Sequence, residues 1–151
     1  MELTDRGPDM HCLCKAVANG HPIAALVGNE VARPGAADMF STGTYWLSGP
    51  PMAAALATLD AIEADDCKSL VHMQEMGRRL TIGLKEKASK AGFSCTVSGP
   101  PAMPLLTFDK ESPHLRPLGE KWCALMAERG IWVHPHHNWY VTASHTQEDI
   151  D

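Results

Sequence analysis

Short apolar runs separated by turn-forming residues characterise the N-terminal part of the chain. Residues 10–14, Met-His-Cys-Leu-Cys, predict a short strand, and residues 22–27 are continuously apolar between Gly20 and Gly28, which is typical of a buried strand. After a loop, residues 51–64 are rich in alanine and apolar nearly all round, a pattern that predicts a buried helix. This pattern indicates part of a parallel-sheet α/β domain.

The pattern changes near residue 65. Residues 66–91 carry an apolar stripe at helical spacing with charges largely off it, and they end at Gly92, a predicted C-cap. Beyond this helix the pattern predicts a smaller α+β unit. Its strands are expected at 93–97, 104–108, 131–134 and 139–143, and its helix at 115–129. Thr146 is a predicted N-cap before an acidic first turn.

Two strands do not make a stable sheet by themselves, and the helix predicted after Thr146 has barely one turn. We therefore expect the chain to be a piece of a longer protein, truncated at both ends.

Charge and hydropathy exclude several kinds of partner and indicate a compartment. The net charge is -5 without a basic stripe, so no nucleic-acid partner is expected. Because the sequence shows no secretory signal and no apolar run of membrane-spanning length, we expect a cytoplasmic protein without a membrane partner.

The five cysteines fit no disulfide or zinc spacing, and we expect free thiols. Lys15 is the residue of greatest chemical interest, because it lies between two apolar segments and before a glycine turn. Partial desolvation there would lower the ammonium pKa and supply the neutral amine that attacks a carbonyl. The alternative is a lysine at a strand end with its head in water. On these residues alone that ordinary interpretation is favoured.

Three segments carry motifs that favour a chemical role for Lys15 over the ordinary interpretation. Residues 8–28 place a Pro-Asp pair before Lys15, and a glycine turn, a proline and an apolar strand after it. Residues 41–59 read Ser-Thr-Gly-Thr-Tyr-Trp and continue into the alanine-rich helix, and residues 130–146 include a His-Pro step. In this order the segments resemble the class III aminotransferases that use pyridoxal 5'-phosphate (PLP), including members similar to glutamate-1-semialdehyde 2,1-aminomutase.

The resemblance implies an α/β fold, the C-terminal part of the PLP-dependent transferase fold type I. Residues 1–65 would be a remnant of the PLP-binding large domain, residues 66–92 a connecting helix, and residues 93–151 a small C-terminal α+β domain, truncated at its end. The implied function is transfer of an amino group through a lysine–PLP Schiff base on a small amino-compound substrate. Aminotransferase and aminomutase remain open alternatives, and the isolated chain is expected to be inactive.

The resemblance also implies residue roles. Lys15 matches the lysine that forms the Schiff base and moves protons, and Thr44 matches a threonine whose hydroxyl and backbone N–H bind the cofactor phosphate, usually across a homodimer interface. The ordinary interpretation of Thr44 is a turn threonine. The family's aspartate that pairs with the pyridine nitrogen lies upstream of the lysine. Asp9 belongs to the Pro-Asp pair and does not match it.

Two other interpretations stay open. In the first, the chain is a non-catalytic truncated product with an exposed apolar patch. In the second, it is a small metal-binding protein that uses residues 134–137, His-Pro-His-His. The metal interpretation is the weaker one, because proline separates the first two histidines and no cysteine or carboxylate is close in sequence. Trp132 and Trp139 are expected in a core or a pocket wall.

Overall fold

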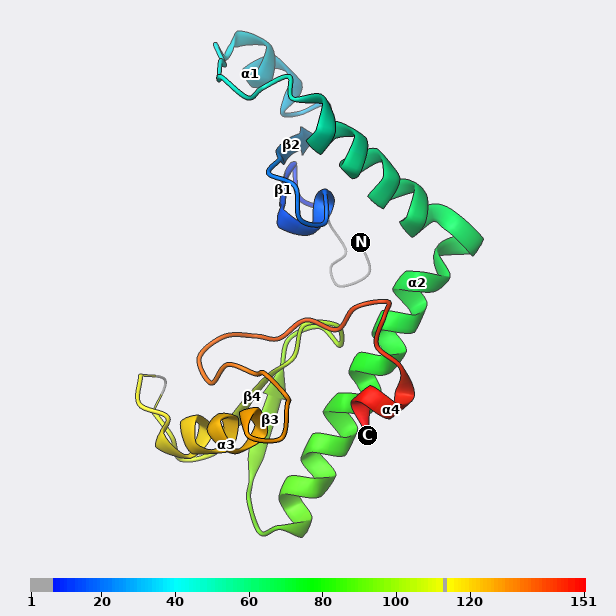
Figure 1. Ribbon diagram of the computed structural model, residues 1–151. Coiled ribbons are helices and arrows are strands. Elements are labelled where there is room, and N and C mark those ends of the chain that lie inside the picture. Colours follow the sequence, from blue (N-terminus) through cyan, green and yellow to red (C-terminus); the bar gives the residue numbers. More distant parts are fainter. Residues whose placement is uncertain (1–6, 113) are drawn as a thin grey trace. The chain divides into compact units, whose positions relative to one another are not determined.

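The computed structural model describes residues 7–112 and 114–151 (Figure 1). The chain divides into two compact units, residues 1–66 and 67–151, which are taken in turn below. The helix α2, Gly49–Lys90, begins in the first unit and ends in the second. No helix of the described residues has the length and apolar character needed to cross a membrane.

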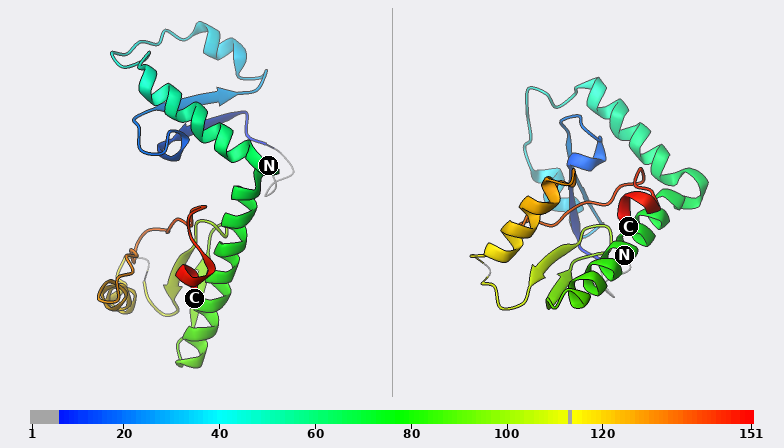
Figure 2. Two further views of the ribbon diagram at one scale, coloured as in Figure 1. Left: turned by 45° about the vertical axis from the view of Figure 1, so that its right-hand side comes forward. Right: turned by 60° about the horizontal axis from the view of Figure 1, so that its bottom comes forward.

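The first unit contains an antiparallel hairpin of β1, Met10–Cys14, and β2, Ala24–Gly28 (Figure 2). Both strands lie where the apolar pattern predicts strands. The expectation of a buried, parallel arrangement is wrong for this pair, because β1 and β2 pair antiparallel and four residues of each strand are exposed. The described residues leave both faces of the hairpin largely uncovered, so its apolar side chains meet solvent.

A short helix, α1, Arg33–Asp38, lies in the region expected to be a loop. Pro34 occupies its first turn, where proline has the backbone angle of a helix and no N–H to leave unpaired. An exposed ion pair at 3.3 Å joins Arg33 to Glu30 just before it. The start of α2 was predicted as a buried helix, and this is also wrong in the chain as described: Leu56 is 63% exposed and Leu59 is 45% exposed.

The structure contains one helix, α2, where the sequence predicted two. Near the expected boundary, Asp65, Asp66 and Cys67 have φ angles of 51°, 55° and 59°. These values lie in the left-handed region, which costs an L-residue about 1–2 kcal/mol. The break between the predicted helices is therefore present as a reversal of backbone handedness inside α2.

This reversal makes a prediction for Asp66, whose side chain is exposed. We expect Asp66→Gly to be more stable than Asp66→Ala by about 1 kcal/mol, because glycine adopts positive φ without a Cβ clash. Urea unfolding monitored by circular dichroism measures the difference. The same two substitutions at Glu63, a right-handed position of α2, should give the opposite order, since alanine is preferred there by about 1 kcal/mol. An alanine preference at both positions would contradict the left-handed assignment.

The second unit holds most of the chain's buried side chains. It contains the C-terminal half of α2, the antiparallel pair β3, Cys95–Ser98, and β4, Leu105–Phe108, and the helices α3, Pro117–Ala127, and α4, Gln147–Ile150. Its buried apolar side chains are those of Met76, Pro104, Leu106, Phe108, Cys123 and Val141. Rings extend this core, with Phe108 edge-on to Trp122 at 6.4 Å and Trp122 stacked on Trp139 at 5.6 Å.

The strands predicted at 131–134 and 139–143 do not form, although the second lies in a strand-like position. The N–H groups of Trp139 and Val141 donate to the carbonyl oxygens of Pro104 and Ala102, both at 2.9 Å. Proline has no N–H, so Pro104 cannot return a bond and the ladder ends there. The predicted strand therefore makes two hydrogen bonds to its neighbouring segment, and that segment cannot complete the ladder.

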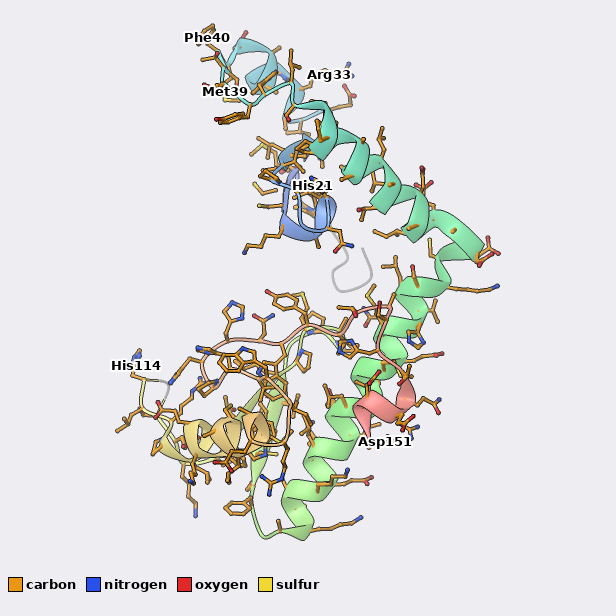
Figure 3. The ribbon with its side chains drawn as sticks, viewed as in Figure 1. His21, Arg33, Met39, Phe40, His114 and Asp151 are labelled. Carbon is orange, nitrogen blue, oxygen red and sulfur yellow. The ribbon has the colours of Figure 1, made fainter. Side chains whose placement is uncertain are left out.

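The C-terminal segment 145–151 is hydrogen-bonded to α2, and its own helix, α4, has an N-terminal cap. Arg79 donates two hydrogen bonds of 2.6 Å to the carboxylate of Asp151, a residue labelled in Figure 3, and these bonds lower the pKa of Asp151. Thr146 is the N-cap, as predicted, and forms a capping box with Asp149; hydrogen bonds from the Thr146 N–H and hydroxyl lower the pKa of Asp149. A lowered carboxyl pKa means that this cap stabilises the fold above the ordinary carboxyl range and is lost as the pH falls through the lowered pKa.

Candidate functional site

Lys15 follows β1 directly and opens a 3₁₀ turn, Lys15–Val17. Its φ angle is 56°, in the left-handed region that is rare for a non-glycine residue. Such outliers are held only where the surrounding structure enforces them, and they cluster at functional sites. The position after the strand agrees with the sequence pattern, and the strained backbone adds an observation that the sequence did not contain.

Backbone hydrogen bonds hold the turn around Lys15. The N–H of Ala18 donates to the carbonyl of Lys15 at 3.3 Å, and the N–H of His21 donates to the carbonyl of Ala18 at 3.2 Å. Ala18 is 1% exposed and serves as the small buried centre of the turn. Gly20, with φ of 111°, lets the chain reverse toward β2.

An open hollow lies beside this turn, lined by Lys15, Ala16, Asn19, Gly20, His21 and Pro22. The Lys15 side chain is exposed. This exposure agrees with the interpretation favoured on the residues alone, a lysine at a strand end with its head in water, and not with partial desolvation, because no other described segment covers the hollow. What the geometry does provide is an accessible primary amine on a turn whose backbone is fixed.

The two ends of the hairpin are closed differently. The Lys15 turn closes one end, and at the other end the Asn29 N–H and side-chain Nδ2 donate to the backbone carbonyl and Oδ1 of Asp9, at 3.0 and 2.8 Å. Asp9 belongs to the Pro-Asp pair of the sequence motif, whereas Asn29 lies in no predicted site. The only sequence signal was an asparagine directly after the glycine that ends β2.

Thr44 lies in an exposed turn and is not among the residues that line the Lys15 hollow. The turn is closed by hydrogen bonds from the N–H of Trp46 to Gly43 at 3.4 Å and from the N–H of Ser48 to Tyr45 at 3.2 Å. The structure therefore does not bring Thr44 and Lys15 together within one chain. The neighbouring aromatic side chains are strongly exposed, with Phe40 at 91% (labelled in Figure 3) and Tyr45 at 86%.

The histidines of residues 134–137 are engaged in local hydrogen bonds. The His136 N–H donates to His134 Nδ1 at 3.1 Å, His136 Nε2 lies 3.1 Å from Glu120 Oε1, and His137 Nδ1 lies 2.7 Å from the Asn138 carbonyl. Within the described ranges, no group of three or more histidine, cysteine or acidic side chains is arranged to hold a metal ion. The metal interpretation thus gains no structural support.

The two tryptophans of the tail both lie in the wall of an apolar hollow in the second unit, as expected. Trp139 packs on Trp122, and its Nε1–H donates to the carbonyl of His134 at 2.9 Å. Trp132 is 86% exposed at the edge of the same hollow. Burial raises the pKa of the Cys123 thiol in this unit, so that cysteine is a core side chain rather than a nucleophile.

Comparison with known proteins places these features in a family. A family model described as Aminotransferase class-III matches residues 1–147. Aminopentol aminotransferase of Sphingopyxis macrogoltabida is 38% identical over 143 residues, 95% of this chain and 33% of that protein. Glutamate-1-semialdehyde 2,1-aminomutase of Thermus thermophilus is 29% identical over 165 residues, 99% of this chain and 38% of that protein.

Solved structures agree with this placement. The FumI protein of Sphingopyxis sp. MTA144, described in its PLP internal aldimine form, matches with a TM-score of 0.86 and 37% identity over 95% of this chain and 34% of that one. An omega-transaminase from Sphaerobacter thermophilus shares the fold with a TM-score of 0.82 at 17% identity, over 95% of this chain and 36% of that one. The chain spans about a third of the length of these relatives. The α/β fold and the family predicted from the three motif segments are confirmed, and the chain belongs to the class III aminotransferases.

Proposed function

We propose that this chain carries the cofactor-binding lysine, Lys15, of a PLP-dependent aminotransferase. One observation carries the proposal: in the segment that resembles the family's lysine motif, Lys15 stands at a strained, hydrogen-bonded turn directly after β1 with its amine accessible. A Schiff base requires a primary amine that a carbonyl carbon can approach. The open hollow beside Lys15 leaves room for that approach, so the residues present fit the cofactor.

When bound, PLP would supply the electron sink for chemistry at the substrate's α-carbon. Lys15 would hold the cofactor through Nζ. Its Nζ would also act as a base that takes the proton from the substrate α-carbon, and then as an acid that gives a proton back. The fixed turn backbone limits where Nζ can reach, so the reacting carbon would have to lie within its range.

Thr44 would bind the cofactor phosphate through its hydroxyl and backbone N–H. Because Thr44 does not line the Lys15 hollow of its own chain, we propose that a second copy supplies it, as the homodimer of the family implies. The exposed aromatic residues around Thr44 support an interface at this turn, since large exposed apolar patches mark interaction surfaces.

The substrate class is a small amino compound with a carbonyl partner. The identity of 38% to aminopentol aminotransferase, against 29% to the Thermus aminomutase, favours transfer between two molecules over transfer within one. The substrate itself is left unassigned, because the chain spans a third of the relatives' length.

The test locates the amine that reacts with PLP. The chain is incubated with PLP, reduced with borohydride and digested, and the pyridoxyl-labelled peptides are mapped. The isolated chain should label weakly over several lysines. A chimera, in which this chain replaces the matching third of the Sphingopyxis aminopentol aminotransferase, should concentrate the label on Lys15. Label concentrated on another lysine of the chimera would refute the proposal.

A further inference from the structure

The end of the β1–β2 hairpin opposite Lys15 is closed by a polar pair, Asp9 and Asn29. Asn29 Nδ2 donates to Asp9 Oδ1 at 2.8 Å, and the Asn29 N–H donates to the Asp9 carbonyl at 3.0 Å. Asp9 stands directly before β1 and Asn29 directly after β2, so the pair joins the two strands where they would otherwise separate. We name these two residues the hairpin clamp.

The hairpin needs such a clamp because its apolar side chains select its register only weakly. Register is strongly specified where one face of a sheet is buried, and here four residues of each strand are exposed. The connection over residues 15–23 is also much longer than the two-residue turns that fix register by their own geometry. Burial therefore does not hold Cys14 opposite Ala24. The backbone hydrogen bonds that fix the Lys15 turn lie within residues 15–21, so they do not set this pairing either.

A shift in register would move Lys15. A slip by one residue displaces a strand by about 3.4 Å and turns its side chains to the opposite face. Lys15 follows the last strand pair, Cys14 with Ala24, without an intervening residue. Its amine would consequently change both its height along the hairpin and its direction.

The clamp is itself held in place. Asn29 Oδ1 accepts the Val31 N–H at 2.9 Å, which orients the amide so that Nδ2 faces Asp9. Gly28 allows the close approach of the two strand ends, because a Cβ at that position would lie 3.2 Å from the Asp9 carbonyl oxygen and 3.0 Å from the Ala32 Cβ. The clamp thus has a donor that is oriented by a second hydrogen bond, and a glycine that lets the two strand ends approach.

We infer that Asp9 and Asn29 are positioning residues that set the register of the hairpin and thereby the place of the Lys15 amine. This inference rests on the proposed role of Lys15. Asp9 acts through the hairpin and needs no contact with cofactor or substrate. The Pro-Asp pair of the motif then has a physical task that differs from that of the aspartate that pairs with a pyridine nitrogen.

The first experiment reads register without any cofactor. Amide hydrogen exchange and cross-strand nuclear Overhauser effects, from Met10 to Gly28 and from Cys14 to Ala24, are measured in the 151-residue chain. Asp9→Ala and Asn29→Ala should each speed exchange of the hairpin amides about fivefold to tenfold, the effect of one lost hydrogen bond. Asp9→Asn should restore slow exchange, because its amide oxygen still accepts from Asn29 Nδ2. Glu30→Ala, which removes the adjacent ion pair with Arg33, is the matched control and should leave the hairpin unchanged.

The second experiment reads the position of the amine. In the chimera, the share of pyridoxyl label on Lys15 should fall about tenfold in Asp9→Ala and recover in Asp9→Asn, while the share on other lysines rises. Unchanged exchange in both alanine variants would overturn the clamp. An unchanged Lys15 share despite faster exchange would overturn only its positioning role. A parent chimera with no concentration of label on Lys15 would refute the proposed function and this inference with it, whatever the exchange rates show.

Discussion

Replacing Gly77 by alanine is expected to destabilise the second unit by about 2–3 kcal/mol, a large part of the stability of a small domain. A Cβ on Gly77 would lie 2.0 Å from the Pro101 carbonyl oxygen, 2.3 Å from its carbonyl carbon and 2.9 Å from the Ala102 nitrogen. All three are backbone atoms, which cannot rotate away as a flexible side chain would. The segment before β4 must therefore shift, and that segment also accepts the hydrogen bonds from Trp139 and Val141.

Two effects of opposite sign compete at this position. Helix propensity alone favours alanine over glycine by about 1 kcal/mol. At a helix position without close neighbours, the substitution would therefore stabilise the protein. Gly83, also in α2, provides the matched control, because nothing lies within 4 Å of its added Cβ. Urea unfolding followed by the fluorescence of the stacked Trp122 and Trp139 measures both variants. Equal stabilisation by the two substitutions would show that residues 101–102 do not pack against α2.

Lys15→Ala in the chimera should reduce the rate of amino transfer by at least about 10³-fold, the usual range for loss of a positioned proton-transfer group. The loss should appear in kcat, because no other lysine is positioned on the turn that borders the hollow. Lys15→Arg should be equally inactive, since a guanidinium stays protonated and forms no Schiff base. Steady-state kinetics with a small amine donor and a keto acid measure the effect.

The control for this prediction is a lysine outside the hollow. Lys90, at the exposed C-terminal end of α2, can be changed to alanine without touching the Lys15 turn. Lys90→Ala should keep the parent rate within a factor of about two, as expected for a surface substitution. Full activity in Lys15→Ala would contradict the assignment of Lys15 as the cofactor-binding lysine. A comparable loss of activity in Lys90→Ala would indicate a general defect of the chimera.

Local sequence rules predicted the elements whose structure depends on near neighbours. The strand before Lys15, the amphipathic helix that contains Met76 and the capping box of Thr146 lie where pattern and capping chemistry place them. These features depend on residues within one or two turns of each other, and such spacings can be read directly from a sequence.

Features that depend on distant partners could not be predicted. A strand is predicted at 139–143, but the outcome is decided by Pro104, which cannot complete the ladder. The helix α1 lies where a loop is expected, although Pro34 in its first turn is a start signal for a helix. Burial of Leu56 is overestimated from the sequence, since apolar character predicts burial only where another segment is present to cover it.

In the candidate site, too, the local features could be predicted and the features that depend on distant partners could not. The place of Lys15 could be predicted, because a lysine between a strand and a glycine turn is a local pattern. Its left-handed backbone and its clamp could not, because they depend on how Asp9 and Asn29 meet across the hairpin. Twenty sequence positions separate those two residues, and only the strand register brings them together.

The left-handed residues at 65–67 also bear on how α2 forms. A helix grows by adding residues of the same handedness to an existing turn, and its first turn is the costly step. Growth from either end of α2 stops at Asp65–Cys67, so each side has to nucleate separately. Helices shorter than about 12–15 residues are marginal alone, and the N-terminal side, residues 49–64, is close to that limit and carries exposed leucines. We therefore expect residues 49–64 to unfold and refold at a rate of their own, and residues 68–90 to fold together with the core around Met76.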